Sequence, residues 1–148
     1  MPNQLPATVE ASFRGIPKQV TLPSGTKLYR IVTPGQNNNL GEYWFSEPTF
    51  KAILDQMKKQ NHSFETVARP RLAVQKAWNL SMSHIVIFKL SVEMAAWIGP
   101  VRFQPHSSRL PNVLFMGNLE QIYIPNLAKD NRSMDSKYGC IQFYGSPF

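Results

Sequence analysis

Thr26-Lys-Leu-Tyr-Arg-Ile-Val-Thr33 is the stretch that indicates most about the fold. Its apolar residues predict a β-strand, and the turn-forming sequence Pro34–Asn39 follows directly. Arg30 is out of place on such a strand, because a charged side chain resists desolvation next to a core. An anion is a frequent reason for such an arginine, and phosphate suits its planar guanidinium best. The alternative is that Arg30 lies on an edge strand and points into water.

The next residues predict a second strand and then a helix. Glu42–Ser46 is an aromatic strand, and Ser46 can cap a helix that carries Pro48 in its first turn. That helix has an apolar stripe at spacings of three and four residues, formed by Phe50, Ile53, Leu54 and Met57. Pro70 interrupts the following region, so we expect only a short helix over Leu72–Trp78.

The second half of the chain predicts strands. Ser83–Ser91 has a continuous apolar centre, which suggests that this strand is buried on both faces. Shorter strands are expected at Ala96–Phe103, with a break at Gly99-Pro100, and at Val113–Phe115, Glu120–Ile124 and Cys140–Tyr144. Because this half lacks crossover helices, an α+β domain is predicted rather than a parallel βαβ array.

The composition of the chain limits its domain organisation and the kinds of partner that it can bind. Residues 1–23 contain four prolines and few apolar positions, so we expect a lead-in or linker, followed by one domain over residues 24–148. Sixteen basic and nine acidic residues give a net charge of +7, which predicts attraction to polyanions; a merely solvated basic surface is the alternative. Residues 1–10 lack the apolar core of a signal peptide, and no apolar run reaches membrane-spanning length.

The sequence lacks the residues that several kinds of covalent link, binding site and catalytic site require. The single cysteine, Cys140, cannot form an internal disulfide, and its apolar surroundings predict a buried structural thiol. His62, His84 and His106 stand far apart, so no metal site is expected. The sequence also has no Walker-type phosphate loop, no dinucleotide-binding glycine motif and no nucleophile elbow.

Polar residues in three predicted strands remain, in the segments Leu28–Val32, Gly41–Ser46 and Asn118–Ile124. In this order they resemble the ADP-ribosyltransferase-like toxin domains at the C-termini of bacterial polymorphic effectors of the Rhs and type VI kinds. The segments Arg69–Val74 with Trp78-Asn79, and Ala96–Pro100, resemble further parts of that family. The resemblance spans roughly residues 26–125 and rests on the order and spacing of short motifs.

The resemblance implies a split β-sheet sandwich with short helices in its first half, which binds NAD in a cleft between two small sheets. Such a domain cleaves the bond between nicotinamide and ribose and passes ADP-ribose to a macromolecule or to water. It implies that Arg30 is catalytic and holds NAD, and that further NAD-binding residues are Tyr29, Tyr43, Trp44, Ser46 and Arg69.

The third motif implies a residue that bonds the ribose and stabilises its positive charge. Strand alternation puts Glu120 and Ile122 on one face, and Gln121 and Tyr123 on the other. The common family pattern would have glutamate at position 123, where Tyr123 stands. Some members carry glutamine at the key position, so Gln121 is the favoured catalytic residue and Glu120 the contender. We therefore expect Gln121 to face Arg30 across one dinucleotide pocket.

The functional hypothesis from the sequence is an antibacterial toxin domain that uses NAD as co-substrate, without a metal. The acceptor is RNA, such as ribosomal RNA, or protein, and a cognate immunity protein is an expected partner. A specialised system would secrete the domain and deliver it to the target-cell cytoplasm. An NAD glycohydrolase is the alternative enzyme, and a basic nucleic-acid-binding module is the alternative without catalysis.

Overall fold

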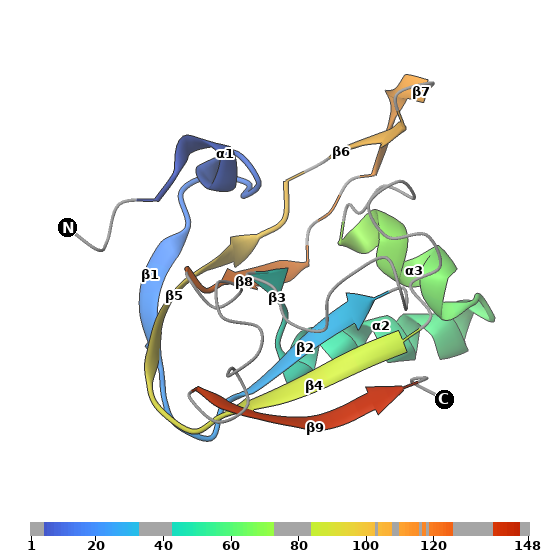
Figure 1. The fold of residues 1–148 in the computed structure, drawn as a ribbon. Coiled ribbons are helices and arrows are strands. Elements are labelled where there is room, and N and C mark those ends of the chain that lie inside the picture. Colours follow the sequence, from blue (N-terminus) through green and yellow to red (C-terminus); the bar gives the residue numbers. More distant parts are fainter. Residues whose placement is uncertain are drawn as a thin grey trace.

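The computed structural model describes residues 5–32, 43–72, 84–102, 104–107, 110–115, 117, 119–125 and 138–145. In these ranges the chain forms antiparallel sheets and three helices, which confirms the expected α+β class (Figure 1). None of the described helices is long and apolar enough to cross a membrane.

The larger sheet has four antiparallel strands in the spatial order β1-β5-β8-β3. They are β1 (Lys18–Leu22), β5 (Met94–Pro100), β8 (Glu120–Tyr123) and β3 (Tyr43–Trp44). Strand β5 continues through Gly99-Pro100, where we expected a break. Pro100 is tolerated because β1 pairs only as far as Ile98, so the missing N–H of Pro100 interrupts no ladder with β1.

The smaller sheet has the order β2-β4-β9 and is also antiparallel. Its strands are β2 (Lys27–Val32), β4 (His84–Leu90) and β9 (Gly139–Gly145). The central strand β4 is buried on both faces, as predicted: Val86 belongs to one apolar cluster and Ile85 to another. Cys140 on β9 is exposed, so the expectation of a buried thiol was wrong. It lies on an edge strand, where only one side has a neighbouring strand.

The helices are α1 (Ala7–Glu10), α2 (Glu47–Gln60) and α3 (Phe64–Arg71), and a hairpin of β6 (Gln104–Ser107) and β7 (Leu110–Phe115) projects beside α3 (Figure 1). Ser46 caps α2 as predicted, because its Oγ accepts a hydrogen bond from the Thr49 N–H at 3.4 Å. Helix α3 begins earlier than the helix we expected and ends one residue after Pro70. The rest of the expected helix, residues 73–78, lies outside the described ranges, as do Pro34–Asn39.

Three apolar clusters hold these layers together. The first lies between the two sheets and includes Leu28, Trp44, Phe88 and Ile122. The second lies between the smaller sheet and helices α2 and α3, with Ile53 fully buried. The third lies on the opposite, outer face of the larger sheet, where α1 covers β5 and β8 (Figure 1). The larger sheet is therefore covered on both faces.

Residues 5–17 form this outer cover, and we call them the N-terminal strap. Phe13 is 1% exposed and packs with Val9 and Tyr123, while the following β1 pairs with β5. The expectation that residues 1–23 are a lead-in or linker is thus corrected for residues 5–22, which pack into the domain. Single buried anchors such as Phe13, spaced among prolines, produce no periodic apolar pattern in the sequence.

Replacing Phe13 by alanine should lower the free energy of unfolding by about 3–5 kcal/mol, because it leaves a cavity under the strap. Urea denaturation measures this, with Ile16→Ala as the matched control. Ile16 is 93% exposed, so its loss should change stability by no more than about 0.5 kcal/mol. Equal effects of the two substitutions would contradict the packing of the strap.

Candidate active site

Among the described residues, the two sheets meet at one backbone bridge, between β2 and the residue after β3. Tyr29 and Phe45 exchange two N–H···O hydrogen bonds of 2.8 Å each. Within the described part of the chain this bridge is isolated, and β2 and β3 belong to different sheets. Next to this bridge, the Arg30 Nη1 donates to the Tyr43 carbonyl at 3.1 Å. Arg30 therefore spans the split between the sheets.

The environment of Arg30 is unusual for a cation. Its Nε is buried and has no hydrogen-bond partner among the described residues. No described carboxylate lies within ion-pair distance of it, and desolvation lowers the pKa of the guanidinium from its ordinary value. A half-buried guanidinium that bonds one carbonyl and leaves a buried donor unused is suited to an anion with two acceptor oxygens.

Tyr29 lies on the other face of β2, and the structure does not bring it to Arg30. Its ring stacks on Phe50 with centroids 5.0 Å apart, and its hydroxyl donates to Glu47 Oε2 at 3.3 Å. Desolvation raises the pKa of this hydroxyl, and the Glu47 carboxylate raises it further. Tyr29 thus anchors α2 on the smaller sheet.

The second motif is divided between three environments. Trp44 is 2% exposed and packs against Phe88 in the core between the sheets, with centroids 5.8 Å apart. Ser46 caps α2. The ring of Tyr43 is 37% exposed and contacts Tyr123, with centroids 5.2 Å apart, on the outer face of the larger sheet. The motif reaches Arg30 through the Tyr43 carbonyl, a backbone partner that sequence motifs do not identify.

The third motif lies on β8, and its two polar residues point to opposite faces. Gln121 pairs with Gly99 and follows the face of Tyr123, towards the strap. Glu120 is exposed and follows the face of Ile122, which packs between the sheets together with Leu28 of β2. Arg30 alternates with Tyr29 and so shares the face of Leu28. The expectation that Gln121 faces Arg30 is therefore corrected: the larger sheet separates them, and Glu120 shares the side of Arg30.

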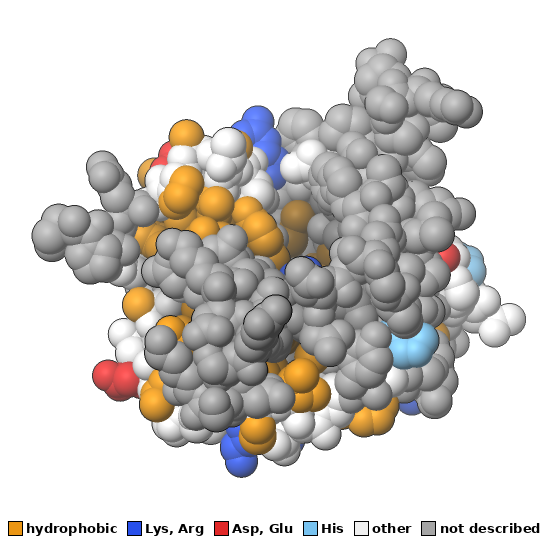
Figure 2. Space-filling model, in the orientation of Figure 1, with side chains coloured by type: hydrophobic (Ala, Val, Ile, Leu, Met, Phe, Trp, Pro, Cys, Tyr) orange, Lys and Arg blue, Asp and Glu red, His pale blue; other side chains and the backbone are white. Residues whose placement is uncertain are grey.

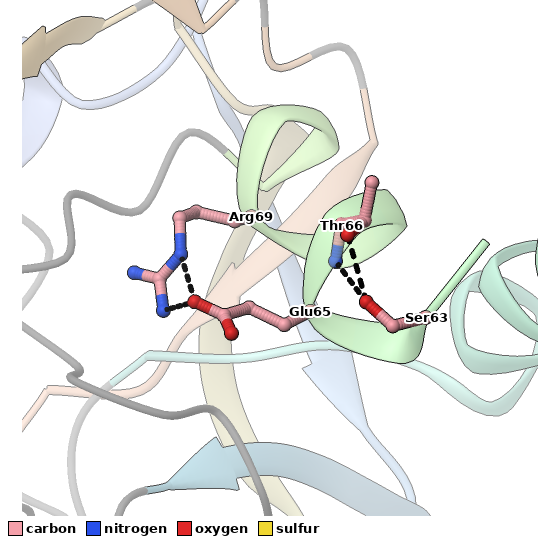
Figure 3. A network of polar contacts seen from close by, with 4 residues as sticks. All are labelled: Ser63, Glu65, Thr66 and Arg69. Carbon is pink, nitrogen blue, oxygen red and sulfur yellow. Dashed lines mark hydrogen bonds and ion pairs between the residues drawn. The ribbon is translucent and has the colours of Figure 1, made fainter.

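Arg69 lies on α3 and has an ion-pair partner on its own helix. Its Nε donates to Glu65 Oε2 at 2.9 Å, and its Nη2 bonds the same oxygen (Figure 3). One turn earlier, Ser63 Oγ accepts a hydrogen bond from the Thr66 N–H at 3.2 Å, which fixes the start of the helix (Figure 3). Arg69 is 7% exposed, and its position favours a structural role for it.

Metal-binding groups and surface hollows are the other candidate ligand sites. The described residues hold no group of three histidine, cysteine or acidic side chains that could bind a metal. A hollow of about 420 Å³ lies under α1 and is lined by the strap together with Arg102. Figure 2 shows hydrophobic side chains gathered beside α1 on this face. The hollow lies on the outer side of the larger sheet, away from Arg30.

No family model and no curated protein sequence matches this chain. The structure is similar to Rhs1-CT, solved in complex with its cognate immunity protein RhsI1. The TM-score is 0.60 and the identity 18%, over 90% of this chain and 83% of that chain. It is also similar to Tne2 in complex with Tni2, with a TM-score of 0.49 and 17% identity, over 73% of this chain and 79% of that chain. At this identity, the similarity to Rhs1-CT shows a shared fold.

The effect of replacing Arg30 on stability distinguishes a ligand-binding role of this residue from a structural role. We expect Arg30→Met to change the free energy of unfolding by no more than about 1 kcal/mol, because lost desolvation cost offsets one lost hydrogen bond. Arg69→Met should cost more, about 1–3 kcal/mol, because it leaves Glu65 without its ion-pair partner. Urea denaturation of both variants tests this order. A larger loss at Arg30 than at Arg69 would indicate that Arg30 mainly holds the two sheets together.

Proposed function

We propose that this chain is a toxin domain that cleaves NAD and transfers ADP-ribose to a macromolecule. The observation that carries the proposal is the Arg30 guanidinium at the split between two small sheets, with a buried donor unused. The fold shared with Rhs1-CT, a domain solved with its cognate immunity protein, supports it. So does the order of the sequence motifs that resemble ADP-ribosyltransferase-like toxins.

Arg30 binds the NAD phosphates in this proposal. A phosphate offers two oxygens to the fork of a guanidinium, and the half-buried position strengthens such bonds because water screens them less. The anion would also supply the negative charge that is absent around Arg30 within the described part of the chain. Lysine would keep the charge but lose the two-point geometry.

Glu120 is the residue we assign to the reaction itself. The bond between C1′ of the ribose and nicotinamide breaks, and its electron pair leaves with the nicotinamide nitrogen. The ribose becomes oxocarbenium-like, and the Glu120 carboxylate stabilises that positive charge. The acceptor then donates a lone pair to C1′ and loses its proton to solvent. The position of Glu120 supports this role, because the residue is exposed and lies on the same side of the larger sheet as Arg30.

The other residues of the sequence hypothesis contribute to the site indirectly. Trp44 fills the core between the sheets, Tyr29 anchors α2 and Ser46 caps it. Together they fix where β2 and β3 diverge. The proposal therefore takes Arg30 and Glu120 as the residues that contact NAD.

The biological setting follows from the same proposal. A domain of this kind is secreted by a specialised system, acts in the cytoplasm of a target bacterium and is neutralised by an immunity protein in its producer. The net charge of +7 favours a polyanionic acceptor such as ribosomal RNA over an uncharged one.

The chemistry predicts that purified protein releases nicotinamide from NAD. Glu120→Gln should lower the rate about 100- to 1,000-fold, because the amide cannot balance the developing charge. Arg30→Met should lower kcat/KM by a similar factor through lost phosphate binding. Chromatography of released nicotinamide measures both.

Two matched substitutions serve as controls. Glu93→Gln removes an exposed carboxylate in the turn between β4 and β5, and Lys27→Met removes an exposed cation from the strand that carries Arg30. Both should keep the wild-type rate within about twofold. Wild-type release that persists in Glu120→Gln and Arg30→Met would contradict the proposed site.

The fate of the ADP-ribose identifies the acceptor. With NAD labelled in its adenylate phosphate and a bacterial lysate, we expect label on a macromolecule, and nuclease or protease sensitivity tells RNA from protein. Label that stays in solution as free ADP-ribose would indicate the glycohydrolase. Salt-sensitive RNA binding without any NAD turnover would overturn the proposal in favour of a nucleic-acid-binding module.

A further inference from the structure

The N-terminal strap is attached to the larger sheet next to Glu120. The Arg14 N–H donates to the Pro100 carbonyl at 2.8 Å, and the Arg102 N–H donates to the Ser12 carbonyl at 3.0 Å. Phe13 forms a β-bridge with Val101 between these two bonds. The strap thus pairs with the end of β5, and Pro100 at that end is the strand partner of Glu120.

Gly99 lets the strap approach this closely. A Cβ at position 99 would lie 3.1 Å from the Phe13 ring and 3.5 Å from the Cα of Pro17. A side chain here would push the strap outward, since contacts of 3.1 Å are shorter than normal van der Waals separation. Gly99 is also the strand partner of Gln121, so the strap comes close to the sheet beside Gln121.

Gln121 holds the strap through its side-chain amide nitrogen. Its Nε2 donates to the Ser12 carbonyl and to Ser12 Oγ, each at 3.1 Å. Ser12 Oγ in turn donates to the Val9 carbonyl at 2.6 Å, which connects the contact to α1. Only a donor at position 121 can make these bonds. A glutamate would direct a carboxylate at the Ser12 carbonyl, so the two acceptors would repel each other.

We propose that Gln121 is a positioning residue: it fastens the N-terminal strap to β8 and so fixes the strand end that carries Glu120. Glu120 is the first residue of a four-residue strand. The strap bonds Pro100, the partner of Glu120 on β5, and Gln121, the next residue of β8. The strap is then part of the catalytic unit. The activity part of this inference rests on the proposed function, whereas the attachment itself does not.

Gln121→Glu tests this proposal, because it distinguishes a catalytic role of Gln121 from a role in fastening the strap. If Gln121 is catalytic, a carboxylate at this position near the ribose should keep or raise the reaction rate. If Gln121 fastens the strap, the same carboxylate should weaken the attachment of the strap. Hydrogen exchange of the Arg14 and Arg102 amides reports strap attachment, since both bond across the contact. We expect their protection to fall at least about fivefold in Gln121→Glu, the loss expected for a net hydrogen bond of about 1 kcal/mol at about 1.4 kcal/mol per tenfold.

In nicotinamide release, Gln121→Glu should lower kcat at least tenfold with the KM for NAD within about twofold, because Arg30 remains intact. Ser12→Ala is the milder second variant, since it removes one of the two acceptors and leaves the carbonyl. It should lower amide protection less than Gln121→Glu, and it should add nothing in a Gln121→Ala background. Gln19→Glu, an exposed glutamine on β1 of the same sheet, is the charge-matched control and should match wild type.

The outcomes are distinguishable. Full amide protection with equal or faster release in Gln121→Glu overturns the assignment and makes Gln121 the catalytic residue. Lost protection with unchanged kcat also overturns it, because the strap would then not position Glu120. If the wild-type protein releases no nicotinamide, the proposed function fails, and amide protection in Gln121→Glu still decides whether Gln121 fastens the strap.

Discussion

Among the described residues, one bridge joins the two sheets, between Tyr29 and Phe45, and the arrangement of these sheets depends on it. Two backbone hydrogen bonds join the smaller sheet to the larger one at this residue pair, and the sheets then diverge. Next to this bridge, the Arg30 side chain donates a hydrogen bond to the Tyr43 carbonyl of β3. A cation is thereby fixed at the opening between two sheets by the way the sheets are joined.

Strand alternation then determines which side chains can share that opening. On β2 it directs Arg30 towards the other sheet and Tyr29 towards α2. On β8 it directs Glu120 towards the side of Arg30 and Gln121 towards the strap. A shift of one residue in the pairing of β8 would exchange the last two. The apolar cluster around Ile122 holds the register, because a shift would move this side chain out of the core.

The sequence predicted the parts of this structure that have local signals. The strands around Arg30 and Ile85, the α2 helix and its Ser46 cap follow from periodicity and capping chemistry, and they are present. The strap and β1 have no such signal, because isolated anchors such as Phe13 gain their burial from distant residues. Strand alternation also predicted correctly that Glu120 and Gln121 point to opposite faces of their strand. Which of the two faces is turned towards Arg30 depends on how the two sheets pack.

Comparison of half-buried Arg30 with buried Arg69 shows why Arg30 is informative beyond its degree of burial. Arg69 has the residue four positions earlier, Glu65, as a partner, so the folded chain itself compensates its charge. Arg30 lies beside the apolar cluster of Leu28 and Trp44, where a hydrocarbon side chain of similar length would pack without any desolvation cost. A residue that departs from the local preference in this way is expected at a functional or strained site. In the function proposed above, the buried and unused Nε of Arg30 is explained by an anionic ligand held between the two sheets.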